Sequence, residues 1–208
     1  MGGPVYVSGA SEGLLDEAVV EVIIRHVGAE PHRFFGGRGK GSLLKQLGGF
    51  NAAALHFPWF VLVDLNSSAH CVAEQRRRWL PNPSPKMCFR IAIREVEAWL
   101  LADRERIAGF LGVPLMRVPH DPELLEDPKQ TLVNLARNSS RVAIRSDLVP
   151  RPSAGRSEGP AYTSALSQFV RDPSAGWRPG IAAARADSLG RCLTRLESLV
   201  RECGAELG

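Results

Sequence analysis

Apolar and polar residues follow two different spacings in the first part of the chain. Residues 4–9, PVYVSG, are a short β-rich run that ends in glycine. The segment after it has apolar residues at helical spacing, namely Leu15, Val19, Val22 and Ile23. Gly28 stands where that helix would end, since glycine is favoured just past a helix C-terminus. The pattern predicts a strand, a turn and a helix.

Two later apolar runs predict buried strands. WFVLVDLN, residues 59–66, is apolar on both faces of a pleat, as a central strand covered by helices would be. HCVAEQRRRWL follows it as a helix that ends before Pro81. The segment from residue 86 begins as a β-rich run, KMCFRIAI, and turns into helix near Glu95. Strands that alternate with helices predict an α/β core with a largely parallel sheet over residues 1–112.

Residues 113–208 predict a helical C-terminal annex that packs on this core as one compact unit. DPKQTLVNLARNS, residues 127–139, is a predicted helix, and residues 145–162 form a basic loop rich in proline, glycine and serine. YTSALSQFV and DSLGRCLTRLESLVREC are two further predicted helices. The second has an apolar stripe at Leu189, Cys192, Leu193, Leu196, Leu199 and Val200.

Composition is that of an ordinary soluble globular protein. The chain has 208 residues, of which 44% are hydrophobic and 23% charged, and this balance argues against disorder. No apolar stretch approaches the roughly 20 residues of a membrane helix, and we expect no signal peptide because the N-terminus lacks a basic region and a cleavage site. The four cysteines are scattered without a C-x-x-C pair, which favours reduced structural thiols. We expect a cytoplasmic protein that does not contact membranes.

The net charge of +4 is unevenly distributed. Between Arg137 and Arg201 there are eleven arginines and five acids, so the rest of the chain is mildly acidic. This asymmetry suits a protein that meets phosphate with one region and cations with another. A general preference for arginine over lysine would explain the choice of residue but not the asymmetry.

Acids and amides follow three predicted strands at their carboxyl ends, where ligands of parallel sheets gather. The candidates are Glu12 after the first strand, Asp64 and Asn66 after the second, and Glu95 with Glu97 after the third. Their oxygens are the ligands that hard cations such as Mg²⁺ prefer. The sequence therefore predicts a divalent-cation site from Glu12, Asp64, Asn66 and Glu97.

Each part of this predicted site also has a purely structural interpretation. Asp64 and Asn66 could form an Asx-turn or cap a helix. Glu12 and Glu97 could favour the first turns of their helices through the helix dipole. Only the arrangement of the acids at three strand ends raises the metal hypothesis above these alternatives.

Basic residues near glycines are candidates for phosphate contacts. Arg38 and Lys40 lie in GGRGKGS, where backbone amides and cationic groups could approach phosphate, although the spacing is not that of a Walker loop. The alternative is a flexible surface loop. Lys129, directly after Pro128, is either a phosphate ligand or a surface residue of a first helical turn. Arg76, Arg77 and Arg78 fit a solvated helix face better than a DNA-binding patch.

The order of VYVSGASEG, FVLVDLN and IAIREVEAWLLAD resembles a TOPRIM-like family of domains of unknown function found beside AAA-type ATPases in bacterial operons. DPKQTLVNL, LVPR, GPAYTSALSQFV and SLGRCLTRL resemble its C-terminal region, so the likeness covers most of the chain. The resemblance implies a TOPRIM-like fold and a nuclease that uses Mg²⁺ or Mn²⁺ to hydrolyse DNA or RNA. It also implies an AAA-type ATPase partner and a role in defence against phage.

TOPRIM and overcoming-lysogenization-defect nucleases imply particular site residues. Gly9 and Glu12 match the first family motif, Asp64 the second and Glu97 the third, so Glu12, Asp64 and Glu97 are the implied catalytic residues. Ser8 stands where the family has an acid, and Asn66 where it has a second aspartate. These two losses of charge favour a single cation over a two-metal mechanism.

The same departures support a second hypothesis of another class. A catalytically silent TOPRIM-like subunit would bind an ATPase or nucleic acid as a regulatory or structural component. A third, weaker hypothesis is a nucleotide sensor that uses the glycine loop.

Overall fold

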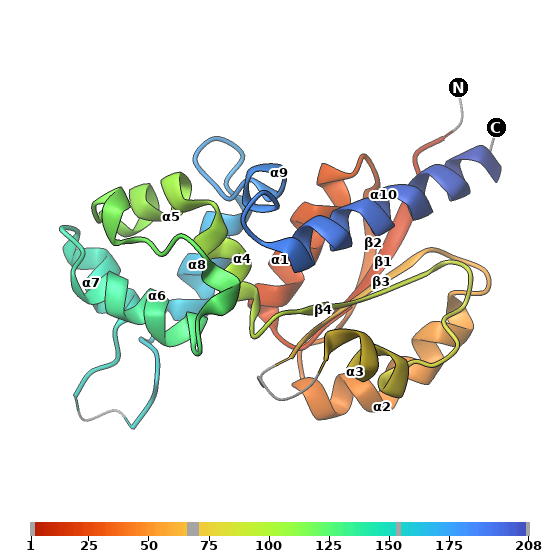
Figure 1. Ribbon diagram of the computed structural model, residues 1–208, viewed down its shortest axis with the longest axis horizontal. Coiled ribbons are helices and arrows are strands. Elements are labelled where there is room, and N and C mark those ends of the chain that lie inside the picture. Colours follow the sequence, from red (N-terminus) through yellow and green to blue (C-terminus); the bar gives the residue numbers. More distant parts are fainter. Residues whose placement is uncertain (1–2, 66–70, 153–154, 207–208) are drawn as a thin grey trace.

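The computed structural model describes residues 3–65, 71–152 and 155–206. Its centre is a four-stranded sheet in the order β2-β1-β3-β4, and all neighbouring strands are parallel (Figure 1). The strands are β1 (Tyr6–Ser11), β2 (Glu30–Gly36), β3 (Trp59–Asp64) and β4 (Met87–Ala92). The predicted α/β class with a parallel sheet is therefore confirmed.

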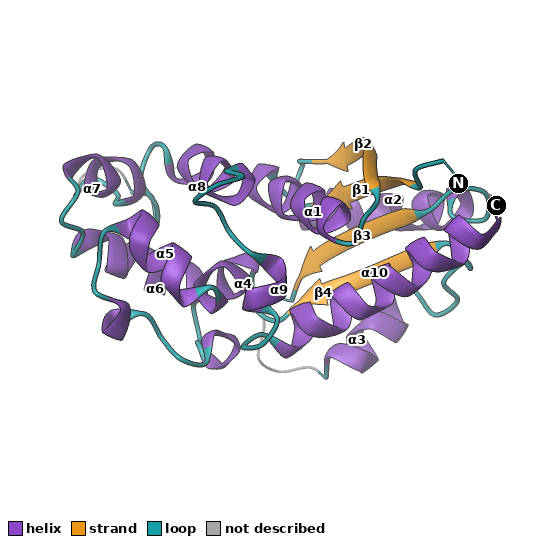
Figure 2. Ribbon diagram, turned by 90° about the horizontal axis from the view of Figure 1, so that it is seen from above, coloured by secondary structure: helices purple, strands orange, loops and turns teal. Residues whose placement is uncertain are grey.

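Helices cover both faces of the sheet. On one face lie α1 (Leu14–His26) and α10 (Asp187–Glu206), and on the other lie α2 (Lys40–Ala53) and α3 (Val72–Trp79) (Figures 1 and 2). Along β3, Phe60 and Leu62 pack into the larger apolar cluster with α1. Val61 and Val63 pack into a smaller cluster with α2. This burial on both sides explains why the sequence of β3 is apolar without alternation.

The remaining helices form a cluster beyond the carboxyl ends of the strands (Figure 1). They are α4 (Val96–Ala102), α5 (Arg104–Leu111), α6 (Pro128–Arg137), α7 (Val142–Leu148), α8 (Tyr162–Arg171) and α9 (Pro179–Ala182), with 3₁₀ turns at Leu115–Arg117 and Pro122–Leu124. Helix α8 packs along α1, and α4 contacts α6 and α9. The cluster thus stands against the sheet edge where the predicted site residues emerge.

The C-terminal helix α10 returns to the sheet and packs on β4. Its stripe is buried as predicted at Leu189, Cys192, Leu193, Leu196 and Leu199, whereas Val200 is only partly buried. The larger apolar cluster contains buried residues from both ends of the chain, from Val5 in the first segment to Cys203 in α10. Within residues 113–208, α10 therefore packs on the sheet, and the other helices belong to the helical cluster. Buried residues of both parts lie in the same apolar core as residues 1–112.

Two elements differ from the sequence expectations. Strand β2 was not predicted and ends at the first residue of the glycine loop GGRGKGS, because an exposed edge strand shows no apolar alternation and depends on its pairing with β1. Gly36 ends this strand at φ +115°, and a Cβ there would lie 1.9 Å from the Ser11 carbonyl oxygen. Helix α7 begins before the predicted basic loop and continues into it, because Ile144 and Leu148 are buried.

Smaller expectations can also be compared with the structure. Gly28 follows α1 with φ +79°, as expected of a residue just past a helix end. Cys88, Cys192 and Cys203 are buried, Cys71 is exposed, and all four thiols are free. In the described part of the chain, no helix has the length and apolar character needed to cross a bilayer.

The first prediction concerns Gly9 in the middle of β1. A Cβ at this position would lie 2.7 Å from the Phe34 ring and 2.9 Å from Val20. Gly9→Ala should therefore lower the free energy of unfolding by about 1–3 kcal/mol, measured by denaturant titration. Gly48→Ala is the matched control, because nothing lies within 4 Å of its Cβ position and α2 should gain about 1 kcal/mol. Equal stability of both variants would contradict the packing argument.

Candidate functional site

The strand order reverses between β1 and β3. The chain passes from β1 through α1 to β2 on one side, and then crosses through α2 to β3 on the other side of β1. The carboxyl ends of β1 and β3 therefore flank the crevice in which open α/β sheets bind their ligands. Glu12 directly follows β1, and Asp64 is the last residue of β3. The topology thus brings two predicted site residues to one place.

Glu12 and Asp64 are directly connected. The Asp64 backbone N–H donates a hydrogen bond to Glu12 Oε1 at 2.9 Å. Asp64 is half-buried, and its buried Oδ1 has no hydrogen-bond partner in the part of the chain that the structure describes. A buried carboxylate oxygen without a partner is energetically costly unless a proton or a cation compensates it.

Glu97 joins this pair from α4. Arg94, between β4 and α4, has φ +66°, a conformation that non-glycine residues rarely adopt and that often marks functional sites. Glu97 is only 3% exposed, and its Oε1 accepts a hydrogen bond from the Tyr162 hydroxyl at 3.1 Å. The Lys129 ammonium lies 3.7 Å from the same oxygen. Glu95 accepts a hydrogen bond from the Lys129 backbone N–H at 3.2 Å.

Asp16 belongs to the same cluster, although the sequence analysis did not select it. It lies on α1, and its buried carboxyl acts on the pKa of Asp64 more strongly than any other charged group. Its signal in the sequence was an acid four residues after Glu12 among apolar helical positions. Tyr162 gave no such signal, because an aromatic residue at a helix start is usually a core residue. We call Glu12, Asp16, Asp64 and Glu97 the acidic cluster.

Burial is the main electrostatic effect in the acidic cluster. It raises the pKa of Asp64 well above the usual range, and the neighbouring Asp16, Glu97 and Glu12 raise it further. Burial also raises the pKa of Glu97 to about 7, against the opposing charge of Lys129. Burial and the nearby Glu12 raise the pKa of Asp16 to about 6, while backbone N–H groups lower it.

Lys129 provides positive charge at this site. Burial alone would lower the pKa of Lys129, but Glu97 and Glu95 raise it above its usual value. Its ammonium also lies 5.9 Å from the centre of the Tyr162 ring. Lys129 is therefore a partly buried ion-pair partner, not a residue of a solvated helix surface. Its contact with nucleic acid stays a prediction.

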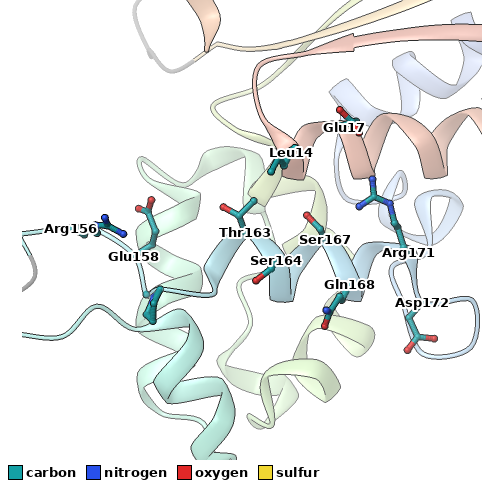
Figure 3. A pocket seen from close by; sticks show the side chains of 12 residues that line it. Leu14, Glu17, Arg156, Glu158, Thr163, Ser164, Ser167, Gln168, Arg171 and Asp172 are labelled. Carbon is teal, nitrogen blue, oxygen red and sulfur yellow. The ribbon is translucent and has the colours of Figure 1, made fainter. Parts of the chain in front are cut away.

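A cavity of ≈ 150 Å³ lies among these groups, lined by Gly13, Leu15, Asp16, Asp64, Val96, Glu97, Lys129 and Tyr162. It has room for a few water molecules or a hydrated cation. Leu14, Glu158 and Thr163 line both this cavity and a larger groove of ≈ 890 Å³ along α8 (Figure 3). The groove connects the acidic cluster with solvent.

The acidic cluster has the oxygen ligands of a divalent-cation site, but these ligands are not arranged around a single cation position. Carboxylate oxygens suit Mg²⁺ and Mn²⁺, and the unpartnered Asp64 Oδ1 is available to a cation. Within residues 3–65, 71–152 and 155–206, however, no three histidine, cysteine or acidic side chains are arranged to hold a metal ion. Asn66, the fourth predicted ligand, lies outside the described residues.

Arg38 and Lys40, the predicted phosphate ligands of the glycine loop, lie in two different environments. Arg38 is exposed in the turn between β2 and α2. The Lys40 ammonium donates hydrogen bonds to the Asp64 carbonyl and, at 3.3 Å, to the Leu65 carbonyl. It also lies 5.0 Å from the centre of the Trp79 ring. Lys40 thus ties the start of α2 to the end of β3, and its role in phosphate binding stays a prediction.

Ser8 does not lie in the acidic cluster. It is in the middle of β1, and its hydroxyl is 3.5 Å from His32 Nδ1. It lines a separate cavity of ≈ 640 Å³ together with His56 and Phe57. An acid missing at Ser8 therefore removes no charge from the cluster, which corrects the inference drawn from the sequence. Gly9 likewise serves the packing between Phe34 and Val20.

Comparison of this chain with protein-family models, with curated protein sequences and with solved structures gave no match. The TOPRIM-like resemblance therefore depends on the motifs quoted from the sequence.

The second prediction concerns Glu97 and pH. The folded protein keeps a proton on Glu97 up to a pKa of about 7, whereas the unfolded chain releases it near the usual value of 4.5. This group therefore favours folding below pH 4.5, and that contribution is lost as the pH rises towards 7. The free energy of unfolding of the unmutated protein should fall between pH 4.5 and pH 7, and Glu97→Gln should make this fall smaller by on the order of 3 kcal/mol. Denaturant titrations at several pH values would measure it, and an unchanged pH dependence would contradict it.

Proposed function

We propose that this chain acts on nucleic acid and hydrolyses phosphodiester bonds with Mg²⁺ or Mn²⁺. The observation that best supports this proposal is the acidic cluster at the sheet's switch point, with the unpartnered Oδ1 of Asp64 at its centre. Strongly perturbed acids in a cavity at this position are typical of active sites. A cytoplasmic location is part of the same proposal.

The donor set indicates which residues would hold a cation. Asp64, Asp16 and Glu97 line the cavity with carboxylates, and Asn66 is a further candidate outside the described residues. A bound divalent cation would neutralise these acids and stabilise negative charge on a phosphoryl group. Glu12 would act differently, because its carboxylate already positions Asp64 through the backbone N–H.

Other residues of the chain would position and tune Glu97. The Tyr162 hydroxyl and the Lys129 ammonium hold Glu97 Oε1 from two sides. A cation held by Glu97 would displace the proton that this carboxyl otherwise keeps up to a pKa of about 7. Glu97 is therefore a proposed cation ligand, and Lys129 and Tyr162 are its positioning residues.

The third prediction tests catalysis. Asp64→Asn keeps the shape of the side chain but removes its charge, so metal-dependent cleavage of plasmid DNA, single-stranded DNA or RNA should fall by about 100-fold or more. Asp121→Asn is the matched control, since Asp121 is exposed and distant in the chain from the cluster. Cleavage by purified protein with Mg²⁺ or Mn²⁺ would be followed on gels. Equal cleavage by both variants would exclude Asp64 as a catalytic residue.

The fourth prediction tests cation binding without requiring activity. Mn²⁺ at about 100 times its Kd should raise the free energy of unfolding by about 2.7 kcal/mol if it binds only the folded protein. Asp64→Asn should lose most of this stabilisation, whereas Asp121→Asn should keep it. Thermal or denaturant unfolding with and without Mn²⁺ would measure the difference. No stabilisation of the unmutated protein would argue against a cation site.

A catalytically silent subunit is the second candidate function. The specific observation in its favour is that the described residues contain no ready group of three metal ligands, while Glu12 and Glu97 already accept hydrogen bonds from the Asp64 N–H and the Tyr162 hydroxyl. Binding of nucleic acid without cleavage, alone and with an AAA-type ATPase, would support this alternative. The AAA-type ATPase partner and the role in phage defence follow from the TOPRIM-like resemblance and have no other support.

A further inference from the structure

A groove of ≈ 890 Å³ runs along α8, and three segments of the chain line it (Figure 3). They are the start of α1 with Leu14 and Glu17, the segment between Arg156 and Pro160, and α8 itself. The volume lies within the roughly 300–1,000 Å³ that is typical of small-molecule sites. We call this cavity the α8 groove.

One wall of the α8 groove is attached to the end of α7. The Gly159 N–H donates a hydrogen bond to the Leu148 carbonyl at 2.9 Å. The Ala161 N–H donates another to the Asp147 carbonyl at 3.0 Å. A Cβ at Gly159 would lie 2.3 Å from the Asp147 carbonyl oxygen, so only glycine fits this contact. Main-chain contacts therefore hold this wall in place.

A buried hydroxyl in the α8 groove has no partner. Ser167 is 8% exposed, and its Oγ has no hydrogen-bond partner among the described residues. Its side chain points from α8 towards α1, whose residues Leu14 and Glu17 line the same groove (Figure 3). Most buried polar groups in proteins are paired, so this hydroxyl indicates a ligand that supplies the missing hydrogen bond.

Exposed polar side chains of α8 extend this hydrogen-bonding surface. Thr163, Ser164 and Gln168 line the groove at helical spacing beside Ser167. Hydroxyl and amide groups both donate and accept hydrogen bonds. They match the edges of a nucleobase and the hydroxyls of a sugar, which also carry both donors and acceptors.

The charges of the α8 groove disfavour a row of phosphates. Three carboxylates and two arginines line it, and one of these arginines, Arg171, already forms an ion pair with Glu21 at 2.7 Å. Backbone phosphates are bound by an excess of arginine and lysine. The α8 groove therefore suits the uncharged base and sugar of a nucleotide better than its phosphate.

The cavity of the acidic cluster adjoins the α8 groove on the side where a phosphate would lie. Leu14, Glu158 and Thr163 line both the groove and this cavity of ≈ 150 Å³. A nucleotide whose base and sugar lie in the groove would therefore direct its phosphate towards the proposed cation. Leu14 is 64% exposed at this junction and offers apolar surface to the face of the base or the sugar.

We propose that the α8 groove binds the base and sugar of one unpaired nucleotide, so that the substrate is single-stranded DNA or RNA. A base of a duplex would first have to unpair and unstack before it could enter. This inference rests on the proposed function, because it names the substrate class of that reaction. The groove needs no cation to hold a base and a sugar, so binding can be measured apart from catalysis.

The first test compares the binding of short fluorescent single-stranded DNA, single-stranded RNA and duplex DNA, followed by anisotropy in the presence of a chelator. We expect a single strand to bind, and the duplex of the same sequence to bind more weakly by about tenfold or more. A duplex that binds as tightly as the single strand, or no binding of either single strand, would overturn the inference. A nucleoside monophosphate that binds as tightly as the strand would also overturn it, because the ligand would then be a free nucleotide.

The second test blocks the α8 groove. Ser164→Trp places an indole in the groove from an exposed position, and Thr194→Trp makes a similar change at an exposed position of α10 that does not line the groove. Ser164→Trp should weaken single-strand binding by about tenfold or more because contacts with the base are lost, whereas Thr194→Trp should change it by about twofold at most. Equal affinities of the two variants would show that the strand binds elsewhere and would overturn the inference.

The third test concerns the unpartnered hydroxyl. Ser167→Ala should leave the free energy of unfolding unchanged or raise it, and should weaken single-strand binding by about two- to tenfold. Ser139→Ala is the matched control, because Ser139 is also buried but its hydroxyl accepts a hydrogen bond from the Arg141 N–H at 2.9 Å. This control should lose stability and keep its affinity. Unchanged binding by Ser167→Ala would contradict the assignment of the groove.

The outcome separates this inference from the proposed function. Single-strand binding that depends on the α8 groove, in a protein that cleaves nothing with Mg²⁺ or Mn²⁺, would support the inference and count against phosphodiester hydrolysis. Cleavage of duplex DNA that depends on Asp64 and proceeds equally in Ser164→Trp and Thr194→Trp would support the proposed function and overturn the inference.

Discussion

The parallel pairing of β1 with β3 is the constraint on which the candidate site depends. It places the ends of two strands that are about fifty residues apart side by side, with helices leaving on opposite faces. The hydrogen bond from the Asp64 N–H to Glu12 Oε1 joins these two ends directly. The other members of the acidic cluster, on α1 and α4, then pack around this junction. Without this strand order, the same acids would be dispersed among separate helix starts.

The burial of negative charge is the second organising feature. Glu97 is almost fully buried and Asp64 is half-buried, and Lys129 forms an ion pair with Glu97. Folding such a group of acids is unfavourable at neutral pH unless protons or cations compensate them. Proteins accept this kind of penalty at functional sites, where the same groups bind or transfer charge. The electrostatics therefore favour a functional over a purely structural origin for the cluster.

The sequence by itself determined the elements with strong local patterns. The runs of β1, β3 and β4, the helices α1, α6, α8 and α10, and the parallel α/β class all follow from apolar spacing and from turn residues. Strand β2 could not be found, because an exposed edge strand depends on pairing with β1 and not on its own pattern. Glu12, Asp64 and Glu97 were selected because they follow strands, which is a local property. Their grouping with Asp16, Lys129 and Tyr162 was decided only by tertiary structure, since packing of α8 on α1 and of α6 on α4 brings distant residues together.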